Sequence, residues 1–433
     1  MTIRRRRFLR AGIAMGAASP SLLSWARAWA AEQPFAPEKG AALRLLRGST
    51  FLPAEGETFA ANVAAFAAAT GVPVTIDNVN QDDLVSKSAL AVQIASGPDL
   101  IWTQNTTAHL FADKLIDVSD VAAYLGGKYG GWYPVCVDYG TENGRWICIP
   151  VFVVGSLLNY RVSWLAEAGF DKMPADTANF LKLCQALKRI GHPAGFSFGH
   201  AVGDANYFAY WLLWTHGGRI TDEHGNVVLA SPQTQEALDY AVELYPTMID
   251  GVSSWMDINN NRAFLAGQIA LTANGISIYT EAKRSVPAIA ADMDHAAMPI
   301  GPVGVATEQN RIDPMMILGY TKYPIAAKAL IAFLMERPQY DRLVTNSAGF
   351  IAQSLKGYAD NPVWRGDPKI APFGRASAAT RSVSWPMTPN PKAAATFASF
   401  LLVDMFATAA SGNATPKAAM ERAQRAAEKI YRS

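Results

Sequence analysis

Tryptophans and uncharged polar side chains, rather than a set of acids, bases and nucleophiles, are the residues of this chain best suited to chemistry. Trp102 is followed closely by Gln104 and Asn105. A flat aromatic ring can cover the C–H face of a polyhydroxylated molecule, and amide groups can donate to and accept from its hydroxyls. This combination favours reversible binding of a small polar ligand. The candidate binding residues are Thr50, Glu55, Trp102, Gln104, Asn105, Trp211, Trp214, His216, Trp255, Asn274 and Trp385.

Several of these candidates have a plain structural alternative. Trp211 and Trp214 are three residues apart in an aromatic segment, a spacing that suits the core face of a helix as well as a binding site. A lone His216 is more often a satisfied polar residue than a functional one. Glu55, like Asp313, could hold a polar or cationic ligand or could be a solvated charge. The sequence leaves these alternatives open.

The sequence offers little support for enzyme chemistry. We expect no dinucleotide-binding glycine motif, no phosphate-binding loop and no nucleophile elbow. The 6 histidines lack a zinc-ligand spacing, and no Cys-x-x-Cys occurs. A glycosidase needs two well-placed carboxylates, and the sequence does not exclude such a pair among 36 acidic residues. We therefore expect a binding protein without cofactor or metal, and an exported enzyme is the alternative.

The elements that must position the candidates follow an α/β pattern, because apolar residues alternate between helical and strand periods. A β-α-β-α-β order at the start predicts a parallel sheet with right-handed crossovers. Ligands of such sheets bind beyond the C-terminal ends of the strands, where Thr50 and Trp102 fall. Strands are expected at 42–48, 72–76, 99–102 and 315–320, and helices at 57–70, 84–96, 108–123, 178–190, 231–245, 393–410 and 416–432.

The first 31 residues have the pattern of an export leader. They hold six arginines and no acidic residue, and Arg5-Arg6-Arg7-Phe8-Leu9 precedes a short apolar stretch and the small-residue run Ala28-Trp29-Ala30-Ala31. This order predicts a twin-arginine signal peptide cleaved near Ala30-Ala31. Its removal leaves 32 basic against 36 acidic residues, a net charge of −4. Such a chain has no reason to bind nucleic acid, and we expect no membrane-spanning stretch after the leader.

Three cysteines carry limited information. None lies near the cleavage site, so we expect no lipid anchor and a protein free in the periplasm. Cys136 and Cys148 flank a turn predicted at Asn143-Gly144, and the periplasm permits disulfides. A bridge between them and a pair of buried thiols both remain open. Cys184 has no evident partner.

The order of segments resembles family 1 of the extracellular solute-binding proteins of ABC importers, which includes maltose-binding protein. Residues 95–102 resemble the family's helix-to-strand turn with Gly-x-x-Pro-Asp, here Ser96-Gly97-Pro98-Asp99. Residues 144–161 are similar to its Gly-Lys-x-Tyr-Gly-x-Pro segment with the following Tyr-Asn, transposed here to Asn159-Tyr160. Residues 213–244 and 263–271 match further landmarks. Where the family often has Gly-x-Trp, this chain reads Asn274-Gly275-Ile276.

The resemblance implies a two-lobed periplasmic-binding-protein fold with a ligand cleft between α/β lobes. Residues 41–150 and 310–365 would form lobe 1, and residues 155–300 and 370–433 would form lobe 2. Hinge closure on ligand is the expected motion. The implied partners are a small-molecule ligand and the membrane permease of an ABC importer, with the protein itself a monomer. The expected ligand is a mono- or oligosaccharide or a sugar alcohol, and an organic cation such as a polyamine is the alternative.

Overall fold

The chain opens with the parallel unit that the sequence predicts. The computed structural model describes residues 20–50 and 52–432, so the twin arginines of the expected leader lie outside the described residues. Strand β1 (Leu43–Gly48) pairs in parallel with β2 (Val74–Val79) and β3 (Leu100–Trp102). Helix α2 (Pro53–Thr70) connects the first two strands and α3 (Leu84–Ile94) leads to the third. Pro53 suits the first turn of α2, and Gly71, with φ 75°, ends it.

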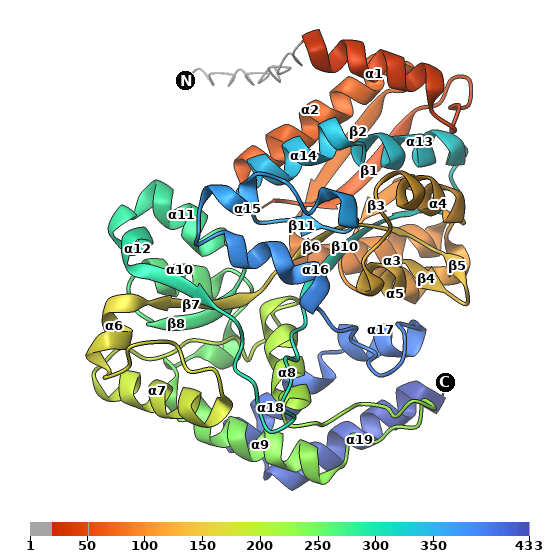
Figure 1. Ribbon diagram of the computed structural model, residues 1–433. Helices are drawn as coiled ribbons and strands as arrows, with labels where there is room; N and C mark the ends of the chain where they lie inside the picture. The colour runs from red at the N-terminus through yellow and green to blue at the C-terminus, as the bar shows by residue number, and fades with distance from the viewer. Residues whose placement is uncertain (1–19, 51, 433) are drawn as a thin grey trace, which may run out of the picture.

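Later segments of the chain complete this sheet. Strand β10 (Arg311–Ile317) runs antiparallel between β3 and β6 (Ile149–Val154), and β11 (Ala352–Gln353) adds the outer edge. The sheet order is β11-β6-β10-β3-β1-β2. Helices α13 (Pro324–Leu334) and α14 (Arg337–Asn346) pack against α2. The first lobe is therefore built from both halves of the chain, as Figure 1 shows by its mixed orange and blue colours.

A smaller sheet organises the second lobe. Strands β7 (Leu157–Arg161), β8 (Leu271–Asn274) and β9 (Met293–Ala296) form an antiparallel sheet in the order β8-β7-β9. Around it stand helices that include α7 (Thr177–Arg189), α8 (Asp204–Thr215) and α9 (Pro232–Leu244). Ser231 caps α9 by accepting from the backbone N–H of Thr234. The C-terminal helices α18 (Leu401–Ala410) and α19 (Pro416–Arg432) pack on α9.

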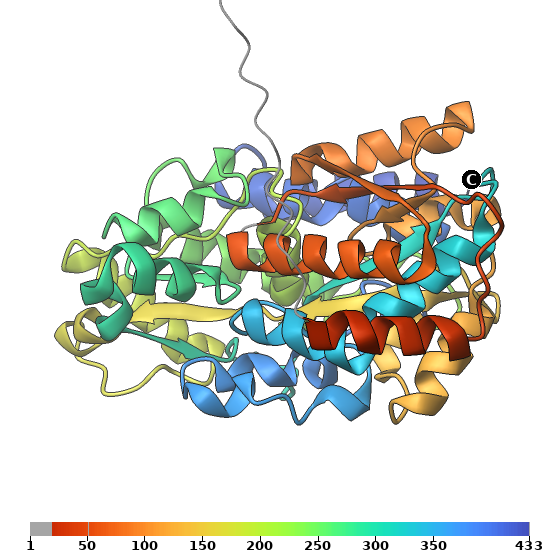
Figure 2. The same cartoon turned by 90° about the horizontal axis from the view of Figure 1, so that it is seen from above.

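The chain passes between the lobes three times, at Gly155-Ser156, at 297–310 and after α16 (Ala376–Ala379). The views from the front and from above both separate the green elements of the second lobe from the orange ones of the first (Figures 1 and 2). Helix α16 packs on β6 and β11. The last passage therefore comes after residue 379, later than the boundary at 370 that we expected.

Two expected helices are divided in the structure. The segment expected at 108–123 is a 3-10 helix, η2 (Thr107–Lys114), followed by α4 (Ser119–Lys128). The segment expected at 393–410 is α17 (Pro391–Ala398) and α18, separated at Phe400, whose φ is 56°. Among the described residues, 391–410 is the one stretch long and apolar enough to cross a membrane, contrary to our expectation of none. It is largely buried against its own protein, as the core helices of a folded domain are.

The predicted turn at Asn143-Gly144 is present, and the cysteines around it are thiols. Both turn residues have positive φ, 50° and 77°, as a two-residue hairpin turn requires. They join β4 (Thr141–Glu142) to β5 (Arg145–Trp146). Cys136 and Cys148 are buried and unbridged, and the Cys148 thiol donates to the Tyr139 carbonyl at 3.3 Å.

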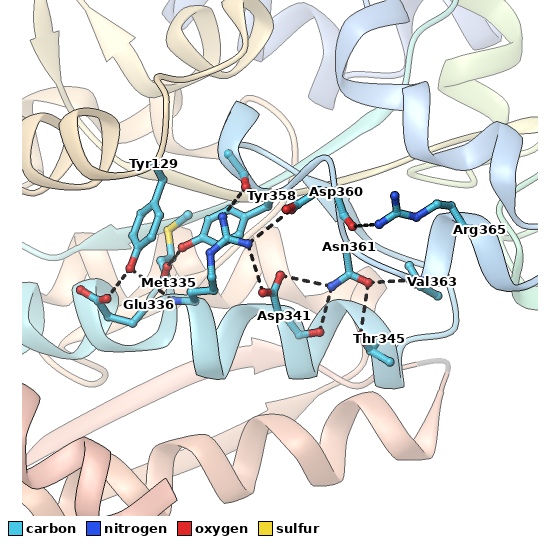
Figure 3. A network of polar contacts seen from close by, with 12 residues as sticks. Tyr129, Met335, Glu336, Asp341, Thr345, Tyr358, Asp360, Asn361, Val363 and Arg365 are labelled. Carbon is cyan, nitrogen blue, oxygen red and sulfur yellow. Dashed lines mark hydrogen bonds and ion pairs between the residues drawn. The ribbon is translucent and has the colours of Figure 1, made fainter.

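Glu336, which precedes α14, gathers donors from several elements. The buried carboxylate accepts a hydrogen bond from Tyr129, and Tyr358 donates to the neighbouring Met335 carbonyl (Figure 3). Lys128 also donates to this carboxylate, at 2.8 Å. Trp29 Nε1 also donates to Glu336, at 3.1 Å. Trp29 belongs to α1 (Pro20–Glu32), which lies in the segment expected to be cleaved and packs on α2.

Candidate ligand cleft

Two small cavities lie at the cleft. One is lined by first-lobe residues where β1 and β3 end, and the other is lined by residues of both lobes where the chain first crosses. Both are lined by Arg311 and Phe350, so they are parts of one cleft. Their volumes are about 30 and 40 Å³, enough for a few water molecules. A sugar needs more room, so the lobes must separate to admit one. The position beyond the C-terminal ends of parallel strands is the one that the β-α-β order predicts.

Arg47, at the end of β1, dominates the first cavity. Its Nη2 lies 3.0 Å from both carboxylate oxygens of Glu55, and both side chains are buried. The guanidinium lies over two rings, 4.3 Å from the centroid of Trp102 and 4.5 Å from that of Phe59. The ion pair and the cation–π contacts fix Arg47 in one orientation. Arg47 therefore covers one face of the Trp102 ring, and the ring is not an open stacking surface for a ligand.

A second buried ion pair stands beside the first. Arg311 Nε lies 2.8 Å from Asp313 Oδ1, and Arg311 Nη2 donates to Asp313 Oδ2 at 2.9 Å. Burial raises the pKa of Asp313, and the Arg311 charge opposes that shift. Each arginine thus has its own carboxylate. This wall of the cleft presents fixed donors and acceptors with no net charge.

The second lobe supplies carboxylates and amides. Asp257 accepts from the backbone N–H groups of Gly203 and Asp204, at 3.2 and 3.0 Å, at the start of α8. Asp204 accepts from Asn260 Nδ2 at 2.7 Å. Burial, with the neighbouring Asp257 charge, raises the pKa of Asp204 well above its ordinary value. Asn274 lines this cavity and donates to Asn261 at 2.6 Å.

Asn105 links the two lobes directly across the cleft. Its Nδ2 donates to the Tyr207 hydroxyl at 3.3 Å, and both residues are buried. Asn105 follows β3 with φ 51°, a left-handed conformation that asparagine tolerates better than most residues. A ligand that enters between the lobes at this point must replace this hydrogen bond with its own.

The structure brings together the candidates that follow strand ends. Thr50, Glu55, Trp102 and Gln104 line the first cavity, and Asn274 lines the second. Gln104 Nε2 donates to Gln81 at 2.8 Å. The rule that ligands bind beyond the C-terminal ends of parallel strands therefore placed Thr50, Trp102 and Gln104 at the first cavity, whereas Glu55 lies in the first turn of α2 and Asn274 ends an antiparallel strand.

The other aromatic candidates lie away from both cavities. Trp211 and Trp214 are buried in α8, and Trp211 Nε1 donates to the Pro299 carbonyl at 3.0 Å. His216 Nδ1 donates to the Leu212 carbonyl at 2.9 Å, and the ring lies beside Tyr240. These side chains form the core of the second lobe. Trp385 lies under Arg381, at 4.4 Å, in the last passage between lobes.

The packing of Trp255 accounts for a Gly-x-Ser-x-Gly motif that we did not expect. Residues 195–199, Gly-Phe-Ser-Phe-Gly, have the spacing of a nucleophile elbow. The segment is irregular rather than a strand-to-helix turn, and Ser197 is buried. A Cβ at Gly195 would come within 2.7 Å of the Trp255 ring, and one at Gly199 within 2.5 Å of its backbone. The two glycines make room for Trp255.

Sequence reasoning missed several cleft residues, namely Arg47, Gln81, Asp204, Tyr207, Asp257, Arg311 and Phe350. Arg47 could have been found, because it precedes Thr50 at the same strand end. Asp204 and Tyr207 lie in an aromatic segment, and aromatic composition by itself does not indicate a binding site. No local pattern places Arg311 or Phe350 in the cleft, which they reach because β10 and β11 return to the first sheet.

Two α/β lobes, crossed by three segments and enclosing a polar cleft, define a two-lobed periplasmic-binding-protein fold. A sequence profile described as bacterial extracellular solute-binding protein matches residues 61–372. The chain belongs to this family. Within the described residues, no group of three or more His, Cys, Asp or Glu side chains is placed to hold a metal ion.

Solved structures share the fold. MalE3 of T. maritima, solved with maltose bound, is 19% identical and superposes with a TM-score of 0.78, covering 90% of this chain and 100% of that one. A solute-binding protein of Agrobacterium radiobacter in complex with ribitol is 17% identical, with a TM-score of 0.75 and coverage of 91% and 100%. A curated relative, a probable ABC transporter-binding protein of Deinococcus radiodurans, is 24% identical over 54% of this chain. The match spans 56% of that relative's length.

Proposed function

We propose that this protein is the periplasmic receptor of an ABC importer and binds a carbohydrate, either a mono- or oligosaccharide or a sugar alcohol. Membership of the extracellular solute-binding family and the name of the Deinococcus relative support the transport role. Structural neighbours solved with maltose and ribitol support the ligand class. The ligand draws the lobes together, and the closed form is the one that the permease recognises.

Two buried ion pairs, in each of which one positive group is neutralised by one negative group, are the observation that most supports a carbohydrate ligand. Arg47 with Glu55 and Arg311 with Asp313 offer oriented donors and acceptors, yet they leave no charge for a ligand to neutralise. A neutral molecule with many hydroxyls fits such a wall, because each hydroxyl can both donate and accept. An anionic ligand would compete with carboxylates already in place.

An organic cation is the second candidate ligand, because Asp204 and Asp257 place two carboxyl groups in the cleft. These carboxyl groups meet at the start of α8 beside Tyr207 and Phe350, which could cover an ammonium group. The backbone donors on Asp257 and the raised pKa of Asp204 reduce the charge available to such a ligand. A carbohydrate therefore remains the first choice.

We further propose an export route, a location and an oligomeric state for the protein. The chain is exported by the twin-arginine route, cleaved near Ala30-Ala31, and acts as a monomer in the periplasm without a lipid anchor. It delivers its ligand without catalysing a reaction. Sequencing the N-terminus of protein recovered from a periplasmic extract tests the leader, and the mass in solution tests the oligomeric state.

Thermal denaturation against a ligand panel tests the binding function. Purified protein is mixed with maltose, ribitol, tagatose, glucose, putrescine or spermidine. A ligand present at 100 times its Kd stabilises by about 2.7 kcal/mol, so at least one carbohydrate or polyol should raise the Tm. The Arg311→Met variant should lose this shift. A shift with putrescine or spermidine alone would establish the cation instead.

A further inference from the structure

A third cavity, of about 270 Å³, lies between the lobes beyond the polar cleft. The first lobe contributes α3 and η2 to its walls. The second lobe contributes the segment before α8 and helix α17. Helix α17 lies against η2, so the cavity exists only when the lobes are together. It is several times larger than either polar cavity.

This cavity adjoins the cleft at the residues after β3. Gln104 lines both this cavity and the first polar one. Asn105 lines it too, and its hydrogen-bond partner Tyr207 lines the second polar cavity. The Asn105–Tyr207 contact thus lies between the second polar cavity and the third cavity, and Gln104 lies between the first polar cavity and the third. A ligand that separates this pair reaches the third cavity.

The chemistry of the third cavity differs from that of the cleft. Its walls include Val85, Ala89, Leu110, Val202 and Phe397, and no charged side chain lines it. An apolar cavity of about 150 Å³ is enough to bind benzene. The cavity therefore has room for one aromatic ring or a short alkyl chain. Its walls also hold the uncharged polar residues Ser86, Gln104, Asn105, Thr106, Thr107 and Asn206. Gln104, Asn105 and Asn206 already donate to Gln81, Tyr207 and the Val202 carbonyl, so fewer donors remain for the hydroxyls of a second sugar.

We propose that this cavity is a subsite for an apolar substituent, so that the ligand is a glycoside whose hydroxyls meet the ion pairs and whose aromatic or alkyl aglycone fills the cavity. This inference rests on the proposed carbohydrate-binding function. Because both lobes form the walls, burial of the aglycone also stabilises the closed form. The protein would then distinguish a substituted sugar from the free one.

Filled variants test the subsite. Ala89→Phe places a ring in the cavity from α3, and Ala398→Phe does so from α17. Ala68→Phe, on an exposed position of α2, is the matched control. The affinities of the phenyl and methyl glycosides of the sugar found by the panel are compared by calorimetry. The phenyl glycoside should bind at least tenfold tighter to the wild type and to Ala68→Phe, and this ratio should approach one in both filled variants.

A probe without any sugar separates the failure of this proposal from the failure of the proposed function. Saturation-transfer NMR with benzyl alcohol should give a signal with the wild type and Ala68→Phe that is lost in both filled variants, whether or not a sugar binds. A phenyl-to-methyl ratio near one in the wild type would overturn the subsite. So would a benzyl alcohol signal that is absent from the wild type or unchanged in the filled variants.

Discussion

The guanidinium of Arg47 lies 4.3 Å from the centre of the Trp102 ring, in the wall of the cleft. The contact changes the role of this tryptophan. We expected an open stacking surface, whereas the ring holds an arginine whose charge is balanced by Glu55. We therefore expect Trp102 to affect a ligand through Arg47, whose position it fixes.

The Arg47–Glu55 pair should matter more for stability than a surface pair. Glu55→Gln leaves a buried guanidinium without its counter-charge, and such a change costs about 3–5 kcal/mol. Asp77→Asn, which breaks the exposed Arg44–Asp77 pair, should cost less than about 1 kcal/mol. Urea denaturation of both variants measures the difference. Equal losses would contradict the burial argument.

The hydrogen bond between Asn105 and Tyr207 should favour the closed lobes in the absence of ligand. Tyr207→Phe removes it with little change in volume, a loss of about 1 kcal/mol. The variant should have a larger radius of gyration by X-ray scattering than the wild type. Tyr210→Phe, within the second lobe, is the control and should leave the radius unchanged. An unchanged radius in Tyr207→Phe would show that other contacts set the closed form.

Trp211 should contribute to stability and not to ligand contact. Trp211→Phe deletes its hydrogen bond to Pro299 and leaves a cavity in the core of the second lobe, for a loss of about 2–3 kcal/mol. The folded variant should bind ligand with unchanged affinity, which calorimetry at low temperature measures. A large loss of affinity would place Trp211 at the cleft after all.

His295 should make stability fall as the pH falls. It is buried between Tyr279 and Phe373, and burial lowers its pKa to about 4. The unfolded chain has a histidine pKa of about 6.5, so the unfolded state takes up a proton first. The stabilisation is complete above about pH 6.5 and is lost as the pH falls towards 4.

A neutral replacement isolates this effect from the other titrating groups. The difference in unfolding free energy between wild type and His295→Gln should shrink by up to about 3 kcal/mol between pH 7 and pH 4. Urea denaturation of the wild type and His295→Gln at four pH values measures this difference. A constant difference for His295→Gln would rule out the lowered pKa.

Helix α1 should stabilise the uncleaved chain. Trp29 is buried against Phe333, with ring centroids 5.0 Å apart, and donates to Glu336. A chain that begins at Glu32 loses these contacts, and burial of such a ring contributes about 2–3 kcal/mol. Deletion of residues 1–19 alone, which keeps α1, is the control. The denaturation midpoints of the uncleaved chain, the chain that begins at Glu32 and the chain without residues 1–19 are compared. Equal midpoints would show that α1 does not stabilise the protein.

The amino-acid sequence by itself determined the local elements and the class of the protein. The β1-α2-β2-α3-β3 order, the cap at Ser231 and the turn at Asn143-Gly144 follow from short-range periodicity, capping and turn chemistry. Ligands bind beyond the C-terminal ends of parallel strands, which lie at one edge of a sheet, and this rule placed Thr50, Trp102 and Gln104 at the cleft. Landmarks spread along the chain predicted the solute-binding family, which the family match confirms.

Only the tertiary structure decided which side chains meet. Trp102 and Trp211 are both tryptophans beside apolar segments, yet one lines the cleft and the other fills a core. Arg311 and Phe350 line both cavities because β10 and its successors return to the first sheet more than 150 residues after β6. Such long-range pairing is set by the packing of whole elements, and no local pattern of residues encodes it.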